Sequence, residues 1–439
     1  MTIAQPIDEY PIKTIILDDD PTGTQTVSGV SVILKPTAVA IRHQFSTPDW
    51  QAVYILTNSR SMPRDAAVQL VQRIKTDAEQ AARETGARIR FLLRGDSTLR
   101  GHIFAEMEAL GGEETAALFV PAFPECGRIT RAGVHYLLSG ITLTPVVKTE
   151  FAQDPVFGYG SEGLTDWVAE VSGGGWSASL VPLEQIRSAD GPGAVCQALL
   201  DAKSGTVVIP DAETYADLKR IAEGLRLAEA AGKQLVIRSA ASFAAVRSGL
   251  QPLSLERAEM SGAGRLLVVC GSHTSASTRQ LELLAQRTGA TPILVPTHRL
   301  LQEEGDAVVR ETAERVADKL RFDRFSIIAS ERVRLQEHSD LAIGSRVMQA
   351  IASIVALVAP ECDGVISKGG ITSAEVASEG LGADTAYVRG QLESGISLWD
   401  IRTRDGRSIP YGVVPGNIGD DAALLRIVSK FDRKLTGGG

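Results

Sequence analysis

The sequence predicts an α/β protein of two domains, each a mostly parallel sheet flanked by helices. Short apolar runs alternate with longer segments that repeat apolar residues at helical spacing, the patterns of strands and helices in turn. Such alternation favours parallel strands with helices on both faces of a sheet. Glycine is abundant, at 42 of 439 residues, which suits many tight turns between strands and helices.

The predicted strands are short apolar runs that end in polar turns. They are Thr14–Leu17, Val53–Thr57, Ile89–Leu93, Ala117–Val120, Thr206–Ile209 and Gln234–Arg238, then Leu266–Cys270, Pro292–Val295, Phe325–Ala329, Gly364–Ser367 and Gly412–Val414. The predicted helices are Asp65–Thr85, Ser275–Thr288, Asp306–Leu320, Ser339–Ala359 and Asp420–Lys434. Residues 254–265 are polar and contain glycine, so we expect one domain at 1–255 and a second at 256–439.

Composition and charge exclude several functions. Lys plus Arg total 45 and Asp plus Glu total 53, so the net charge is −8, which argues against nucleic-acid binding. The longest apolar runs, such as Ile351–Ala359, are shorter than the ~20 residues of a membrane helix. The first residues lack the pattern of a secretory signal. Four scattered cysteines argue against a structural zinc site and fit a reducing, cytoplasmic location.

Three adjacent carboxylates follow the first predicted strand. Ligands of open α/β sheets bind at the carboxyl ends of strands, so the turn with Asp18, Asp19 and Asp20 is a candidate site. Like charges this close are costly unless a ligand, a metal or backbone N–H groups satisfy them. One aspartate would suffice to cap a turn shaped by Pro21 and Gly23, so three favour a function. Asp19 and Asp20 are therefore candidate substrate ligands.

Two further turns of the first half carry cations. Arg60 can hold a substrate carboxylate through two parallel hydrogen bonds, although a lone arginine is more often a surface residue. The turn 93–102 contains two arginines, an aspartate and two hydroxyls, which suit an acidic, polyhydroxylated small molecule. Either Arg94 or Arg100 would meet the carboxylate of such a molecule. Asp96 can also accept a hydroxyl proton or cap the next helix.

Three turns of the second half suit an anion. Each follows an apolar strand and contains small residues, and backbone N–H groups at a helix start bind phosphate. One such turn is commonplace, but three in one domain favour a nucleotide polyphosphate site. The turns are 268–277, 366–374 and 414–421. In the second turn, Gly369 and Gly370 would let the backbone approach a phosphate, and Thr372 or Ser373 would cap the helix. The GxxxxGK[ST] motif of P-loop NTPases is absent.

With these turns, the chain resembles the four-carbon acid sugar kinase family, ATP-dependent kinases of threonate, erythronate or 3-oxo-tetronate. Seven segments match in order across nearly the whole chain: ILDDDPTGTQTV, TNSRS, RGDSTLRG, VPAFPECGRITRAGVHYL, VVCGSHTSAS, SKGGITSAEV and VVPGNIGDD. The resemblance implies a sugar-acid-binding first domain, a nucleotide-binding second domain and phosphoryl transfer in the cleft between them. Carried over to this chain, the acid is held by Asp20, Arg60 and Arg94–Ser97, and ATP by Ser272, Thr274, Gly369–Thr372 and Gly416.

The implied reaction transfers the γ-phosphoryl group of ATP to a hydroxyl of the acid, and we expect the terminal one, O4. Such transfer needs alignment, charge neutralisation and a group that orients or deprotonates the hydroxyl. Asp20 is the first candidate for that catalytic group and Asp96 the second. Arg60 and Arg94 would fix the carboxylate.

Mg²⁺ is expected together with ATP, because a hard cation bridges the phosphate oxygens. The sequence shows no dedicated set of metal ligands, and Asp19 and Asp421 are the candidates. The expected partners are the sugar acid and ATP, with a homodimer but neither nucleic acid nor membrane. Arg94 replaces a lysine common in the family and His273 stands in a turn where many members have cysteine, so the acid itself is not assigned.

Two other interpretations remain open. Residues 15–22 fit the DxDxT motif of haloacid-dehalogenase-type phosphatases, with Asp18 as the nucleophile and Asp20 as the acid. That interpretation places its first and last motifs in different domains and leaves the turns RGDSTLRG, GSHTSAS and GGITS unexplained. The second alternative is a sensor that binds an acid sugar or a nucleotide without turnover, although binding alone gains little from three carboxylates.

Overall fold

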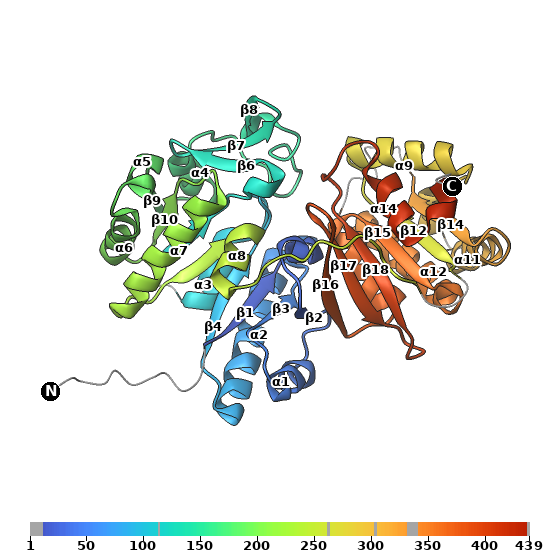
Figure 1. Ribbon diagram of the computed structural model, residues 1–439, viewed down its shortest axis with the longest axis horizontal. Coiled ribbons are helices and arrows are strands. Elements are labelled where there is room, and N and C mark those ends of the chain that lie inside the picture. The colour runs from blue at the N-terminus through green and yellow to red at the C-terminus, as the bar shows by residue number, and fades with distance from the viewer. Residues whose placement is uncertain (1–11, 113–114, 261–263, 303–304, 332–340, 437–439) are drawn as a thin grey trace. The chain divides into compact units, whose positions relative to one another are not determined.

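The computed structural model describes residues 12–112, 115–260, 264–302, 305–331 and 341–436. The chain forms two compact units. The first contains the described residues up to Asp19 together with Pro36–Leu250, and the second contains Asp20–Lys35 together with the described residues from Gln251 onward. Each unit is a sheet flanked by helices, which confirms the predicted fold class (Figure 1).

The sheet of the first unit is parallel throughout. Its strand order is β3-β1-β4-β11-β5-β10-β9. The strands are β1 (Lys13–Asp18), β3 (Ala52–Leu56), β4 (Ile89–Arg94), β5 (Ala117–Val120), β9 (Ser177–Val181), β10 (Thr206–Pro210) and β11 (Val236–Ser239). The predicted strands of this half are confirmed. The sequence analysis missed β9, because SASLV is half polar and lacks a continuous apolar run.

Helices cover both faces of this sheet. They are α1 (Ala38–Ser46), α2 (Arg64–Thr85), α3 (Ile103–Gly111), α4 (Leu164–Val171), α5 (Leu183–Arg187), α6 (Gly191–Asp201), α7 (Tyr215–Ala230) and α8 (Ala241–Ser248). The connections through α2 and α3 run one way along the sheet, and those through α6 and α7 run the other way. Crossovers between parallel strands are right-handed, so the two groups lie on opposite faces.

A small antiparallel sheet is inserted between β5 and α4. It consists of β6 (Arg128–Arg131), β7 (Val134–Ser139) and β8 (Thr142–Pro145), in that order. The sequence analysis predicted no strands here. Residues 146–163 follow this sheet and lead into α4.

The sheet of the second unit is parallel on one side and antiparallel on the other. Its order is β13-β14-β12-β15-β18-β17-β16-β2, with parallel pairs from β13 to β18 and antiparallel pairs beyond. The strands are β2 (Val30–Ile33), β12 (Leu266–Cys270), β13 (Ile293–Val295), β14 (Phe325–Ser330), β15 (Gly364–Lys368), β16 (Thr385–Glu393), β17 (Ile396–Arg402) and β18 (Ser408–Val414). The predicted strands of this half are confirmed, whereas β2, β16 and β17 were missed.

The helices of the second unit are α9 (Ser275–Thr288), α10 (Thr297–Leu301), α11 (Gly305–Phe322), α12 (Leu341–Val358), α13 (Gly370–Glu375) and α14 (Ala423–Phe431). The first two residues of the predicted helix Ser339–Ala359 lie outside the described residues. α9 packs against α14, while α11 packs against α12.

One segment, Ile343–Glu361, is long and apolar enough to cross a membrane by length and composition. Its continuous apolar run is still short, because polar residues interrupt it, while the mean hydropathy of the segment is 1.5. Ile351, Ile354, Val355 and Val358 are fully buried at helical spacing, whereas Leu357 is exposed. This one-sided burial is that of a core helix, and a single such helix is weak evidence for a membrane span.

The segment Asp20–Lys35 belongs to the second unit, although it lies near the start of the chain. Its strand β2 pairs with β16, and the 3₁₀ helix η1 (Pro21–Thr26) contacts β17. Thr24 Oγ1 accepts a hydrogen bond from Trp399 Nε1 at 3.0 Å, and both residues are fully buried. The two units therefore differ from the two contiguous domains, 1–255 and 256–439, that were expected from the sequence. The pairing of β2 with a distant strand leaves no local signal in the sequence.

Replacing Thr24 by Val is expected to lower the free energy of unfolding by about 1–3 kcal/mol, because the buried Trp399 N–H loses its acceptor. Urea-induced unfolding followed by circular dichroism measures this change. Thr76→Val is the matched control, since the Thr76 hydroxyl is exposed and donates only to its own helix. Equal stability of both variants would contradict the anchoring role of Thr24.

The sheets place two pairs of strand ends where ligands are expected. In the first unit, β1 and β4 are neighbours, and the chain goes from β1 to β3 on one side but from β4 to β5 on the other. In the second unit, β12 and β15 are neighbours, and the chain leaves them toward β13 and β16 in opposite directions. Such reversals of strand order are where open α/β sheets bind ligands.

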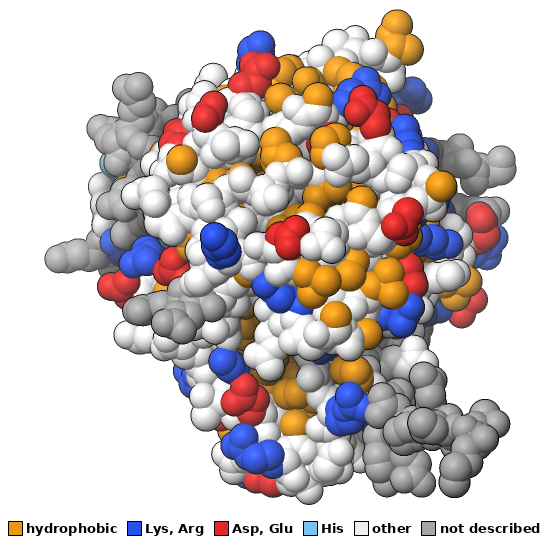
Figure 2. All heavy atoms as spheres, turned by 90° about the vertical axis from the view of Figure 1, so that its left-hand side faces the viewer, with side chains coloured by type: hydrophobic (Ala, Val, Ile, Leu, Met, Phe, Trp, Pro, Cys, Tyr) orange, Lys and Arg blue, Asp and Glu red, His pale blue; other side chains and the backbone are white. Residues whose placement is uncertain are grey.

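Surface charge is mixed on the face that Figure 2 draws. Lys and Arg side chains alternate there with Asp and Glu, rather than forming one positive area.

Candidate active site

Asp19 lies at the end of β1, surrounded by arginines of three other elements. Its Oδ2 is 3.6 Å from Arg60 Nε and 3.6 Å from Arg238 Nη2, and its Oδ1 is 3.7 Å from Arg94 Nη1. The side chain is 2% exposed. The parallel register that puts Asp18 opposite Arg94 brings the ends of β1 and β4 together.

Neither carboxylate oxygen of Asp19 has a hydrogen-bond partner among the described residues. Burial raises the pKa of this carboxyl to about 6, while Arg60, Arg94 and Arg238 act in the opposite direction. A buried carboxylate without donors is costly, so the site is suited to a ligand that donates hydrogen bonds. The hydroxyls of a polyol are such donors.

The neighbouring charges are held by pairs that the sequence analysis missed. Arg238 Nη1 contacts Glu106 Oε2 at 2.5 Å, and Ser59 donates to the other oxygen of Glu106. Arg94 Nη1 donates to Asp18 Oδ1 at 3.0 Å. One signal could have identified Arg238, because it is a charged residue near the end of an apolar strand, as Arg94 is. Glu106 gave no signal, because it lies within a helix of mostly apolar residues.

Gly95 is required by close packing. A Cβ at this position would lie 2.5 Å from Arg238 Nη2, so a side chain would displace the arginine from Asp19. The predicted residue Gly95 therefore contributes by leaving space for the Arg238 side chain beside Asp19.

The rest of the predicted turn is fixed by hydrogen bonds. Asp96 Oδ2 accepts from Arg100 Nε at 2.8 Å and from Thr98 Oγ1. Although burial disfavours its charge, Arg100, Arg60 and Thr98 hold the pKa of Asp96 well below its ordinary value. The carbonyl of Ser97 accepts from His135 Nε2 at 2.8 Å. Asp96 is therefore a firmly ionised anchor of the turn.

His135 connects this turn to the small sheet. Its Nδ1 contacts Thr130 Oγ1 at 3.0 Å, and the bond to Ser97 assigns the proton to Nε2. Burial lowers the pKa of His135 to about 4, so the ring is neutral at physiological pH. Tyr159 donates to the carbonyl of Thr98 at 3.1 Å, so residues of the insertion hold the turn at two points.

Asp20 is placed differently from its two neighbours. It belongs to the second unit, where its Oδ1 accepts from the backbone N–H of Thr22 at 2.8 Å and caps η1. Its carboxylate also lies against Gly370, where a Cβ would collide with it. Of the three aspartates, Asp18 and Asp19 group with the first unit and Asp20 with the second.

In the second unit, the turns after β12 and β18 are in contact. Thr274 Oγ1 donates to the carbonyl of Gly416 at 2.6 Å, and Ser277 Oγ donates to the same carbonyl at 3.0 Å. Ser277 also donates to Ser272 Oγ at 2.8 Å. A Cβ at Gly416 would lie 2.5 Å from Ser272 Oγ, so glycine permits this contact.

The turn after β15 lies against the same residues. Gly369 has φ +113°, a conformation that favours glycine, and a Cβ there would lie 3.1 Å from Cβ of Ser272 and from Thr372 Oγ1. Ile371 is 40% exposed, whereas Thr372 is buried. The structure therefore brings the predicted residues of all three turns together. The sequence analysis missed Lys368, a fully buried lysine at the end of β15 whose Nζ donates to the carbonyl of Pro415 at 2.9 Å.

These three turns have features of a phosphate-binding site, whereas the described residues offer no cluster of metal ligands. The glycines let these turns pack closely, because a Cβ at Gly369 or Gly416 would crowd Ser272, and α9 begins directly after the first of the turns. Within the described ranges, no group of three or more His, Cys, Asp or Glu side chains could hold a metal ion. Asp421 contacts Arg279 at 2.8 Å, and Asp19 faces arginines.

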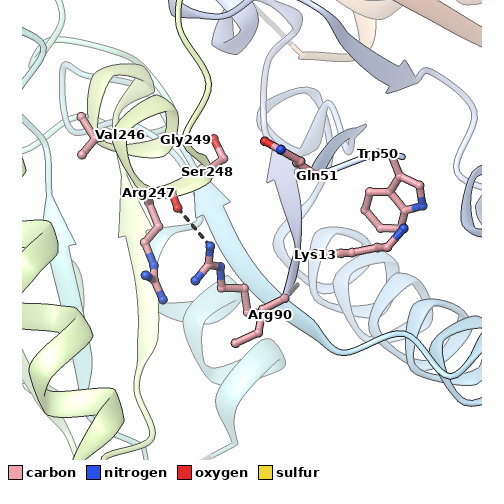
Figure 3. A pocket seen from close by; sticks show the side chains of 9 residues that line it. Lys13, Trp50, Gln51, Arg90, Val246, Arg247, Ser248 and Gly249 are labelled. Atoms are coloured by element: carbon pink, nitrogen blue, oxygen red, sulfur yellow. Dashed lines mark hydrogen bonds between the residues drawn. The ribbon is translucent and has the colours of Figure 1, made fainter. Parts of the chain in front are cut away.

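A separate pocket of 310 Å³ lies at the opposite ends of β1 and β4 (Figure 3). Its cations already have partners: Lys13 lies over the Trp50 ring at 4.4 Å, Arg90 donates to the carbonyl of Arg247 at 3.1 Å, and Arg247 pairs with Glu229. We assign no function to this pocket.

Two family models match this chain, one in each half. Residues 14–247 match a family model described as "Sugar-binding N-terminal domain", and residues 267–424 match "Nucleotide-binding C-terminal domain". The chain is 27% identical over 425 residues to the D-threonate kinase of Cupriavidus necator, covering 93% of this chain and 96% of the relative. It is 26% identical over 391 residues to the D-threonate kinase of Bordetella bronchiseptica, covering 88% of each. Haemophilus influenzae protein HI1011 shares the fold, with a TM-score of 0.60 at 18% identity, covering 95% of this chain and all of that one.

The fold, the two sites and these matches define a carbohydrate kinase. The chain belongs to the four-carbon acid sugar kinase family. This finding confirms the resemblance and sets aside the phosphatase and the sensor. The homodimer, the cytoplasmic location and phosphoryl transfer between the domains stay predictions.

Proposed function

We propose that the protein transfers the γ-phosphoryl group of ATP to the terminal hydroxyl of a four-carbon sugar acid, with D-threonate as the first candidate. The observation that carries the proposal is the buried Asp19 carboxylate, which faces three arginines and has no hydrogen-bond partner among the described residues. A sugar acid supplies the missing donors through its hydroxyls. The relatives named D-threonate kinase support this choice of acid.

Asp19 is the proposed catalytic base. A carboxyl with a pKa of about 6 is ionised at neutral pH yet basic enough to accept the proton of the attacking hydroxyl. Asp96 is less suited, because Arg100 and Thr98 already donate to it and its pKa is depressed. Asp20 caps η1 and packs on Gly370, which supports a role beside the nucleotide turns.

The arginines around Asp19 neutralise charge during transfer. Arg60 is the most accessible of the three, at 15% side-chain exposure, and is the proposed contact to the incoming phosphoryl oxygens. The turns with Ser272, Gly369 and Gly416 hold the nucleotide phosphates through backbone N–H and hydroxyl groups. Ordering these phosphates is the expected contribution of the second unit.

The proposal is tested by ADP release with ATP and Mg²⁺ against D- and L-threonate, D- and L-erythronate and the 3-oxo-tetronates. We expect release that depends on the acid and is fastest with D-threonate. Release with another acid would keep the reaction and change the substrate. Acid-independent ATP hydrolysis, or no release with any acid, would contradict the proposal.

A further inference from the structure

Arg128, on β6, is a buried arginine that forms no ion pair within the described part of the chain, although the charge of Asp96 acts to raise its pKa. Three arginines of the first unit are buried: Arg94, Arg128 and Arg238. Arg94 contacts Asp18 and Arg238 contacts Glu106. Arg128 makes no ion pair with any carboxylate of the described residues. An unpaired buried charge is costly, so such an arginine is expected to have an anionic ligand.

The guanidinium of Arg128 is fixed by one hydrogen bond, and its Nε side makes none with the described residues. One nitrogen, Nη1, donates to the carbonyl of Cys126, which fixes the plane of the group. Its Nε is buried and has no hydrogen-bond partner among the described residues. Burial also lowers the pKa of Arg128, as expected where a charge is incompletely compensated. An Nε edge held in this way suits the planar, charge-assisted pairing that arginine makes with a carboxylate.

The position of Arg128 connects it to the acid-binding turn. Successive side chains of a strand point to opposite faces, so Arg128 and Thr130 share a face of β6. Thr130 contacts His135, and His135 donates to the carbonyl of Ser97. The turn from Arg94 to Ser97 thus has Asp19 at one end and the Arg128 face of β6 at the other. The charge of Asp96, in this turn, acts on the pKa of Arg128, and the charge of Arg60, which lies 3.6 Å from Asp19, acts on the pKa of Asp96. These interactions place Arg128 and Asp19 around the same turn.

We propose that Arg128 binds the carboxylate of the sugar acid and selects acids over neutral sugars. This inference rests on the proposed function and deepens it. Asp19 then takes the hydroxyl end, while Arg60 and Arg94 are not required for the carboxylate. The inserted sheet β6–β8 thereby acquires a role in specificity.

The test compares wild type with Arg128→Gln and Arg128→Lys, using D-threonate and its neutral amide, D-threonamide. In Arg128→Gln we expect the KM for D-threonate to rise by about 10- to 150-fold, the range of a hydrogen-bonded charge, with the KM for ATP unchanged. Arg128→Lys should lose less, because it keeps the charge but not the fork. The amide should bind wild type and Arg128→Gln equally. Arg131→Gln is the matched control, since Arg131 lies on the same strand but is 49% exposed and pairs with Glu213.

Thermal unfolding with D-threonate separates this inference from the proposed function. A ligand that binds the native state raises the unfolding temperature. A D-threonate shift in wild type that is lost in Arg128→Gln supports the inference, even if no acid is phosphorylated and the proposed function fails. Without ligand, Arg128→Gln should unfold no lower than wild type, because it removes an unpaired charge. An unchanged KM and shift in Arg128→Gln, or no shift in wild type with any acid of the panel, would overturn the inference.

Discussion

Replacing Asp19 by Asn is expected to lower kcat by about 10²- to 10⁴-fold, the usual contribution of a general base. Asn keeps the size of the side chain but cannot accept the proton of the hydroxyl. ADP release at saturating ATP and acid measures the loss. Folding is checked by thermal unfolding, and because burial disfavours the charged form of Asp19, the variant should unfold no lower than wild type at neutral pH.

The pH profile gives Asp19 a second signature. The base acts when ionised, so kcat/KM should fall as pH drops through about 6 and be about tenfold lower at pH 5 than on the plateau. The Asp19→Asn variant should not show this fall in kcat/KM at low pH. Stability should change with pH in the opposite direction to activity. The pKa of Asp19 in the folded protein lies above the ordinary value of 3.8, so its contribution to the free energy of unfolding is lost as the pH rises from about 4 to 6.

Asp20→Asn is the matched comparison. Asn caps a helix as well as Asp does, so the hydrogen bond from Thr22 survives and the cap is preserved. We expect this variant to keep most of its activity. A large loss confined to Asp20→Asn, with Asp19→Asn active and its low-pH limb intact, would assign the base to Asp20 instead.

Gly370→Ala is expected to raise the KM for ATP by about 5- to 150-fold. The added Cβ would collide with the Asp20 carboxylate, so either Asp20 or the turn after β15 must move. Overpacking of this kind costs about 1–3 kcal/mol, which corresponds to the stated range. Steady-state kinetics at saturating acid measures it, together with the KM for the acid.

The control for this variant is Gly160→Ala. Gly160 has ordinary backbone geometry, and its Cβ would lie 3.7 Å from the nearest atom, a Glu170 oxygen. It should have wild-type kinetics. If Gly370→Ala also kept the wild-type KM for ATP, the turn after β15 would not contact the nucleotide.

The sequence predicted those parts of the fold that leave a local pattern. Central parallel strands such as β1 and β12 are continuous apolar runs because both faces are buried. β16 lies in the antiparallel part, and its exposed and buried residues alternate, as in TAYVRGQLE. That period of two was a usable signal that a search for continuous runs passes over. β2 is only four residues long and depends on β16, so no local pattern identifies its partner.

The residues of the candidate sites likewise fall into those that the sequence predicted and those that only the structure reveals. Arg94 and Gly369 were found because each lies just after a predicted strand, and strand ends share one edge of a sheet. Arg128 was missed because its significance is the absence of a carboxylate partner, which only the packed structure reveals. The different placements of Asp19 and Asp20 could not be predicted either, because adjacent residues were expected to act together.

The discontinuous second unit has a consequence for biosynthesis. Val30 of β2 pairs with Val388 of β16, so a segment that leaves the ribosome early must wait for its partner until most of the chain has been made. At the usual 5–20 residues per second, this wait is roughly 20–70 s. During that time β2 lacks its partner β16. The second unit is therefore completed only near the end of synthesis, when a strand made early pairs with one made late.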